Sequence, residues 1–114
     1  LLMIDILGGA TPLVDTHLQT LELLRDPGHV RDFTTVEWRA HLGAAGYEIE
    51  EEQSWPVRLE FASWVQRMRT PAESVAAIRR LQQGAPREVQ EALAIEPDGS
   101  FSPRVGLFWA RRRG

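Results

Sequence analysis

The chain has 114 residues, of which 43% are hydrophobic and 25% are charged, and its formal net charge at pH 7 is −3. These values are typical of one globular domain or a piece of a larger one, and the acidic balance argues against nucleic-acid binding. All 13 basic residues are arginine, which excludes Schiff-base chemistry and a phosphate-loop lysine. The absence of cysteine excludes disulfides and thiolate chemistry.

The first predicted element is a strand over residues 1–7, which is apolar on both faces. Such a run is typical of a strand that is buried on both sides in a parallel sheet. The glycine pair at 8–9 ends it. Because the sequence starts inside this strand, we expect either that Met3 is a start site or that residues preceding Leu1 have been lost.

Two helices are predicted next. Thr11 is a capping residue followed by proline, and apolar residues then recur at helical spacing over 12–25. A short connector at 28–33 leads to a capping-box pattern at 34–37, which begins the second helix. Gly46 is placed to close that helix in the left-handed conformation.

A half-exposed strand is predicted over residues 47–55, near an edge of the sheet. Pro56 limits its pairing. The alternation predicts two faces: Tyr47, Ile49 and Trp55 on one, and Glu48, Glu50 and Glu52 on the other.

The remaining elements are three helices and a strand. The first helix covers 61–68, and a second capping box with proline at 70–73 begins the next helix, which ends at Gly84. A short helix follows over 86–94. The strand over 105–110 is apolar on both faces, which again indicates burial.

The order of these elements predicts an α/β fold. A buried strand at each end of the chain implies a sheet that is covered on both sides, but three strands are too few for a complete doubly wound sheet. We expect a single domain or fragment over 1–114. Within it, 1–59 and 96–114 form the sheet and its flanking helices, and 60–95 form a helical insertion.

The connector carries a recognisable pattern. Residues 25–34 read Arg-Asp-Pro-Gly-His-Val-Arg-Asp-Phe-Thr, followed by Glu37-Trp38 and by Ala-Ala-Gly-Tyr-Glu-Ile at 44–49. This succession resembles the class I S-adenosylmethionine-dependent methyltransferases, and within them the group of ubiquinone/menaquinone-type methyltransferases. The resemblance covers nearly all of the chain, as the C-terminal part of a Rossmann-like methyltransferase.

The resemblance implies a place for each strand. Residues 1–7 would be the fifth strand of the family's seven-stranded sheet, 47–55 the sixth, and 105–110 the seventh, which lies antiparallel between the other two. The insertion at 60–95 would cap the substrate. The family's glycine-rich cofactor turn and its ribose-binding acidic residue have no counterpart here. We therefore expect S-adenosylmethionine to serve the parent enzyme, no cofactor-binding residues in this chain, and no activity or tight cofactor binding by the chain alone.

By the same resemblance, a small organic molecule accepts the methyl group, and six residues are candidates to bind it. His29 and Arg31 are also the two catalytic candidates, since an imidazole exchanges a proton near pH 7 and a guanidinium holds an anionic oxygen. The full set of candidates is Asp5, His29, Arg31, Trp55, Trp64 and Met68.

Each candidate also has a structural interpretation. Arg31 could pair with Asp26 or Asp32 inside the connector, and Asp5 could hydrogen-bond the loop after its strand. Aromatic residues at helical spacing, such as Trp64, are commonly part of a core. The sequence contains no metal-binding spacing of two histidines, so it predicts no metal site.

The exposed edge of the first strand, with no fourth strand beside it, predicts a homodimer. We expect a cytoplasmic protein without nucleic-acid or membrane partners. The alternative to an enzyme part is a stand-alone module for small-molecule binding or dimerisation that derives from such an enzyme. The sequence does not name the acceptor or the methylated atom.

Overall fold

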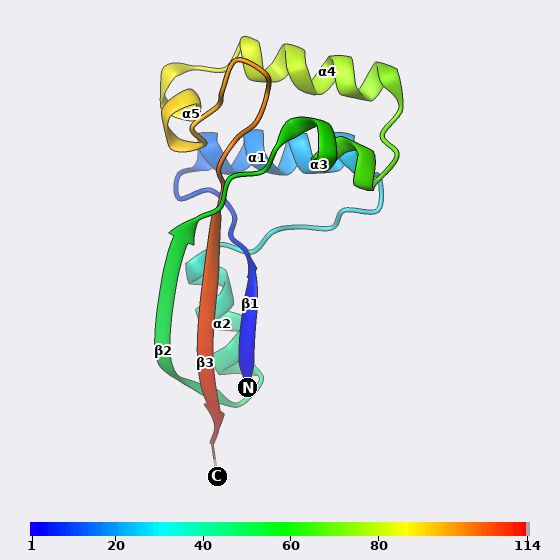
Figure 1. Cartoon of the computed structure of the whole chain (residues 1–114). Helices are drawn as coiled ribbons and strands as arrows, with labels where there is room; N and C mark the ends of the chain where they lie inside the picture. The colour runs from blue at the N-terminus through cyan, green and yellow to red at the C-terminus, as the bar shows by residue number, and fades with distance from the viewer. Residues whose placement is uncertain (114) are drawn as a thin grey trace.

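The computed structural model describes residues 1–113, with a group of helices at one end and a three-stranded sheet at the other (Figure 1). The predicted order of elements is confirmed, and most boundaries agree within one or two residues. The elements are β1 (Leu2–Ile6), α1 (Pro12–Arg25), α2 (Thr35–Ala44), β2 (Tyr47–Pro56), α3 (Phe61–Arg67), α4 (Ala72–Gln83), α5 (Arg87–Ala92) and β3 (Arg104–Arg112).

The sheet has the strand order β1-β3-β2, and β3 runs antiparallel to both neighbours. This confirms the predicted α/β fold with its antiparallel last strand in the middle. Because β1 and β2 both oppose β3, they run parallel to each other, and their carboxyl ends lie at the same end of the sheet. That end faces α1, α3, α4 and α5 (Figure 1).

Strand β2 carries a bulge between Ile49 and Glu51, where its pairing with β3 shifts by one residue. An extra residue in one strand reverses the alternation of side chains beyond it. Glu52 therefore lies opposite Phe108, on the same face of the sheet as Ile49.

The bulge corrects the predicted faces of this strand. Tyr47 and Ile49 share one face, but Trp55 lies on the other, and Glu52 does not lie with the other predicted glutamates. Glu52 points to the helix side, where its carboxylate accepts a hydrogen bond of 2.8 Å from Nε of Arg39 in α2. The sequence pattern contains no signal for the inserted residue.

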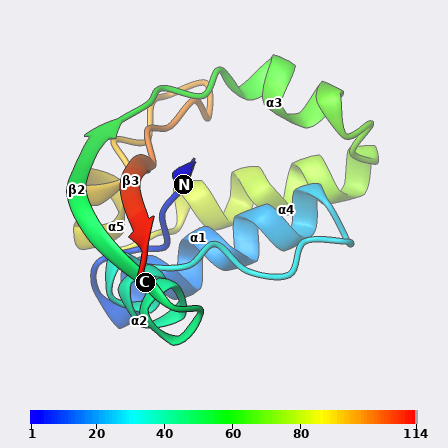
Figure 2. The same cartoon turned by 90° about the horizontal axis from the view of Figure 1, so that it is seen from below.

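In the described part of the chain, only one face of the sheet is packed. There α2 covers a small core of Leu7, Leu42 and Phe108, and Figure 2 shows α2 on that side. On the opposite face Leu2, Ile4 and Trp109 are 51%, 53% and 48% exposed. The prediction of strands buried on both sides is therefore wrong for the described residues, because no helix among them packs on this second face.

We call α1, α3, α4 and α5, with the loop that carries Phe101, the helical unit, and β1, β2, β3 and α2 the sheet unit. The helical unit has its own core, in which α1 and α4 run side by side (Figure 2). The core residues are Val14, Leu18, Leu21, Phe61, Trp64, Ile78, Val89, Leu93 and Phe101.

Helix starts follow the sequence at two of three predicted caps. The Thr11 side chain caps α1, and Thr34 and Glu37 form the predicted capping box of α2. The predicted box at Thr70 is wrong. Helix α4 begins after Pro71 without a side-chain cap, because the Thr70 hydroxyl donates instead to the carbonyl of Arg25. Gly46 has φ +90°, as its position after α2 predicts.

Within residues 1–113 we find no helix with the length and apolar character needed to cross a membrane.

Candidate functional site

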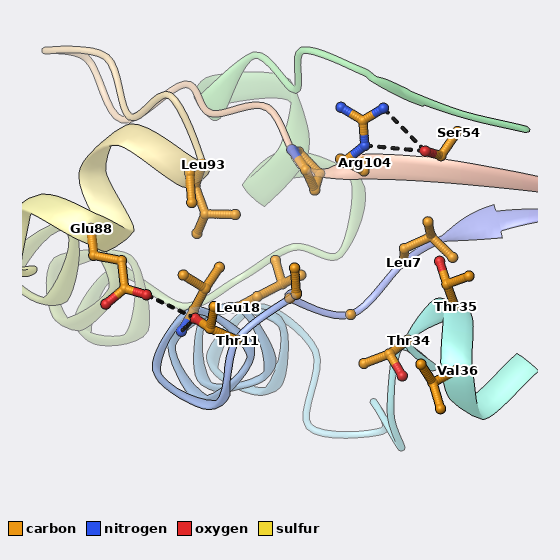
Figure 3. Close-up of a pocket in the computed structure, with 16 residues that line it drawn as sticks. Leu7, Thr11, Leu18, Thr34, Thr35, Val36, Ser54, Glu88, Leu93 and Arg104 are labelled. Atoms are coloured by element: carbon orange, nitrogen blue, oxygen red, sulfur yellow. Dashed lines mark hydrogen bonds between the residues drawn. The ribbon is translucent and has the colours of Figure 1, made fainter.

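A cavity of about 650 Å³ lies where the two units meet, at the carboxyl ends of β1 and β2 (Figure 3). Ligands of open α/β sheets bind in this position, outside the carboxyl ends of the parallel strands. The apolar side chains of its wall are those of Leu7, Ala10, Val14, Leu18, Val36, Ala92, Leu93 and Pro103. Its volume is in the range of pockets that hold small organic molecules.

The glycine pair after β1 forms one side of the cavity, and neither residue tolerates a larger side chain. A Cβ on Gly8 would lie 2.7 Å from both a side-chain oxygen of Asp15 and the carbonyl of Asp32. A Cβ on Gly9 would lie 2.3 Å from the backbone nitrogen of Asp15. The close approach of this turn to the first turn of α1 therefore shapes the cavity wall.

Polar groups are few and lie around the apolar wall. Thr11 caps α1 and donates its hydroxyl hydrogen bond to Glu88 of α5 over 3.0 Å. Arg104, at the start of β3, donates to the hydroxyl of Ser54 over 3.1 Å (Figure 3). No carboxylate of the described residues lies within ion-pair distance of Arg104. An apolar ligand with one polar or anionic group would match this lining.

No protein-family model matches the chain. Two curated bacterial proteins are similar in sequence. The uncharacterized protein YafE of Escherichia coli K12 is 40% identical over 105 residues, which is 92% of this chain and 51% of YafE. The uncharacterized methyltransferase YcgJ of Bacillus subtilis 168 is 33% identical over 72 residues, which is 63% of this chain and 28% of YcgJ.

Two solved structures are similar to the chain in fold. The crystal structure of YcgJ from B. subtilis matches 99% of this chain and 51% of its own length, with a TM-score of 0.86 and 28% identity. The chain therefore matches the C-terminal part of a class I methyltransferase. A predicted methyltransferase from Bacillus halodurans C-125 shares the fold over 99% of the chain and 55% of its own length, with a TM-score of 0.91 at 24% identity.

The chain corresponds to the C-terminal part of this fold. It spans about half the length of YafE and less than a third of YcgJ in the sequence matches. The expected resemblance to the C-terminal part of a methyltransferase and the expected fold are thus confirmed.

The six candidate residues do not come together within the described part of the chain, and none of them is among the residues that line the cavity. Arg31 forms ion pairs with Asp15 of α1 and Glu37 of α2, both over 2.9 Å. It pairs with neither Asp26 nor Asp32. The hydrogen bond from Arg31 is the chief cause that lowers the pKa of Glu37 to about 2.

His29 contacts α1 through Gln19, whose side-chain amide also donates to Asp15. Its Nε2 is 3.0 Å from Oε1 of Gln19 and 3.9 Å from Oδ2 of Asp32. Asp5 lies on β1 opposite Gly106, and its carboxylate accepts a hydrogen bond from the next backbone nitrogen.

The two tryptophans and the methionine have different surroundings. Trp64 is 1% exposed in the core of the helical unit. Its ring packs edge to face against that of Phe101, with the ring centroids 4.9 Å apart. Trp55 lies on the open face of the sheet, 36% exposed, and Met68 is 42% exposed beyond the end of α3.

Sequence reasoning missed the residues that do line the cavity. The signal available was the glycine pair at 8–9, directly after a buried-type strand and before a capped helix. The contributions of Glu88, Leu93 and Arg104 had no such signal, since they reach the cavity only through tertiary packing.

Proposed function

We propose that the cavity is the acceptor site of an S-adenosylmethionine-dependent methyltransferase, and that this chain supplies the acceptor side of that enzyme. The observation that supports it most directly is the cavity's position at the carboxyl ends of two parallel strands. The similarity to YcgJ, an uncharacterized methyltransferase, supports the reaction class.

The lining residues would bind and orient the acceptor. Leu18 and Leu93 provide apolar contact, while Arg104 provides a positive charge for an anionic or polar group at the opening. The helical unit excludes water from one side of the cavity. Methyl transfer depends strongly on positioning of the reacting atoms, so such a site contributes by holding the acceptor still.

S-adenosylmethionine supplies the methyl group when it is bound. The glycine-rich turn that holds this cofactor in the family is absent from the sequence, so we assign cofactor binding to the other half of the parent enzyme. The chain alone would then bind the cofactor weakly or not at all.

A methyl-transfer assay tests the acceptor site. The protein is YafE carrying this chain in place of its matching segment, incubated with labelled S-adenosylmethionine and a panel of small apolar anions. In Ala92→Trp, an exposed cavity residue is enlarged so that its side chain fills the site. We expect transfer to fall at least about tenfold, which equals a loss of about 1.4 kcal/mol of transition-state binding.

The matched control is Ala76→Trp, which places the same side chain at an exposed position of α4 away from the cavity. It should keep full activity, and cofactor affinity should be unchanged in both variants. Full activity of Ala92→Trp would show that the acceptor binds elsewhere.

A second candidate function is supported by the open sheet edge. Within residues 1–113, β1 pairs only with β3, and Leu2 and Ile4 are about half exposed. We propose that the isolated chain forms a homodimer through this edge, in line with the stand-alone module alternative. Sedimentation equilibrium should give a dimer that Ile4→Lys converts to a monomer, while a clean monomer of the wild-type chain at high concentration would contradict the proposal.

A further inference from the structure

Three potential metal ligands converge beside α1, away from the acceptor cavity. Glu22 lies in the last turns of α1, and His29 and Asp32 lie in the connector after it. One ligand atom of each lies within 4.8 Å of the other two. All three side chains are largely buried, with 6%, 13% and 12% of their surfaces exposed.

Two carboxylate oxygens in this cluster have no hydrogen-bond partner among residues 1–113. These are Oε1 of Glu22 and Oδ2 of Asp32. Arg25 does not satisfy Glu22, because the approach of 4.0 Å between its Nη2 and Oε2 is too long for a hydrogen bond. A buried carboxylate oxygen without a partner is costly, so these two oxygens favour the binding of a positive group.

The neighbouring residues hold the cluster in place. The side-chain amide of Gln19 donates to the carbonyl of Asp32, and its oxygen accepts from the Asp32 backbone nitrogen. Burial, and next the negative charge of Asp32, raises the pKa of Glu22 to about 7. The pKa of Asp32 is raised by burial too.

We propose that Glu22, His29 and Asp32 bind a divalent transition-metal ion such as Zn²⁺ or Mn²⁺. One imidazole nitrogen and two carboxylates suit these ions better than Mg²⁺, which prefers oxygen ligands alone. The ion would replace the contact between His29 Nε2 and Gln19, while Gln19 keeps its bonds to Asp32. It would fix the connector against the end of α1.

Isothermal titration of the full chain with Zn²⁺, after removal of metals by a chelator, tests the site. We expect one ion per chain. Glu22→Gln and Asp32→Asn should each weaken the binding by at least about 100-fold, because losing a ligand costs more than losing an outer group that supports a ligand, which costs about 10–100-fold. Zn²⁺ should also raise the melting temperature of the wild-type chain and not that of Glu22→Gln.

The control is His17→Gln, which removes a histidine on the same helix outside the cluster and should keep the wild-type affinity. A folded Glu22→Gln chain is expected, because the amide has the shape of the carboxylate without its charge, and circular dichroism checks it. In nuclear magnetic resonance, Zn²⁺ should shift the ring nitrogens of His29 and leave those of His41 unchanged.

The proposal is overturned by any of three results. The wild-type chain binds no stoichiometric ion, or the Glu22→Gln and Asp32→Asn chains bind as tightly as the wild type, or the ion shifts His17 or His41 in place of His29. None of these results bears on the acceptor site, which the Ala92→Trp assay tests separately.

Discussion

The helical unit and the sheet unit differ in how completely they bury their apolar side chains. In the helical unit, Trp64, Ile78 and Phe101 are at most 1% exposed. In the sheet unit, one face packs against α2, while Leu2 and Trp109 on the other are about half exposed. The helical unit thus carries a complete core, whereas the sheet unit has apolar surface available for another partner, a second copy or the other half of a methyltransferase.

The largest predicted effect tests this contrast with two tryptophans. Trp64→Ala should lower the free energy of unfolding by about 3–5 kcal/mol, because it removes a fully buried aromatic side chain. Trp109→Ala, on the open face, should change it by about 0.5 kcal/mol or less. Urea unfolding followed by circular dichroism measures both. Equal losses would mean that the open face is packed in solution.

The turn between the two units gives the next effect. Gly9→Ala should cost about 1–3 kcal/mol, because the added Cβ would lie 2.3 Å from the Asp15 backbone nitrogen. Gly43→Ala is the control, since its Cβ meets nothing within 4 Å. Inside helix α2 it should instead stabilise the chain by about 0.5–1 kcal/mol. Thermal unfolding compares them, and a tolerated Gly9→Ala would show that this turn is not tightly packed.

A pH-dependent effect comes from Glu22 inside the helical unit. Its pKa of about 7, raised from 4.5, means that the folded state holds the proton more tightly than the unfolded state. Stability should therefore fall as pH rises from about 4.5 to 7. Glu22→Gln lacks this carboxylate and should be more stable than the wild type by about 1–2 kcal/mol at pH 8, and equal to it near pH 4.

The measurement is chemical unfolding across this pH range with a chelator present. Glu48→Gln, at an exposed position of β2, is the control and should leave the pH profile unchanged. A parallel offset between the Glu22→Gln and wild-type profiles at all pH values would contradict the assigned pKa.

The smallest predicted effect concerns the ion pairs that tie the two units together. Arg31→Ala should cost about 0.5–1 kcal/mol at pH 7, since the pairs with Asp15 and Glu37 are partly exposed. The Glu37 contribution should disappear as pH falls from about 4.5 toward 2. Arg87→Ala, at a highly exposed ion pair, is the control with an effect near zero.

Local signals in the sequence predicted the elements well. Thr11 with Pro12 and the box of Thr34 with Glu37 mark helix starts through bonds to neighbouring residues, and the structure contains both. Gly46 likewise marks the end of α2. These features depend on a few adjacent residues, which a sequence pattern contains in full.

Features that depend on tertiary packing escaped prediction. Because of the bulge in β2, Trp55 lies on the opposite face from Ile49. Thr70 does not cap α4, because its hydroxyl donates to the carbonyl of Arg25. The cavity is formed by side chains as distant in sequence as Leu7 and Arg104. His29 and Arg31, two residues apart, contact different side chains of α1. Alternation within the connector does not decide which ones.

The central claim is that this chain provides the acceptor side of a methyltransferase and needs another half for the cofactor. Calorimetric titration of S-adenosylmethionine tests it most directly, with the chain alone and with YafE carrying the chain in place of its matching segment. The account predicts saturable one-to-one binding by the fused protein and no saturable heat with the chain alone. Tight one-to-one binding by the isolated chain would contradict it.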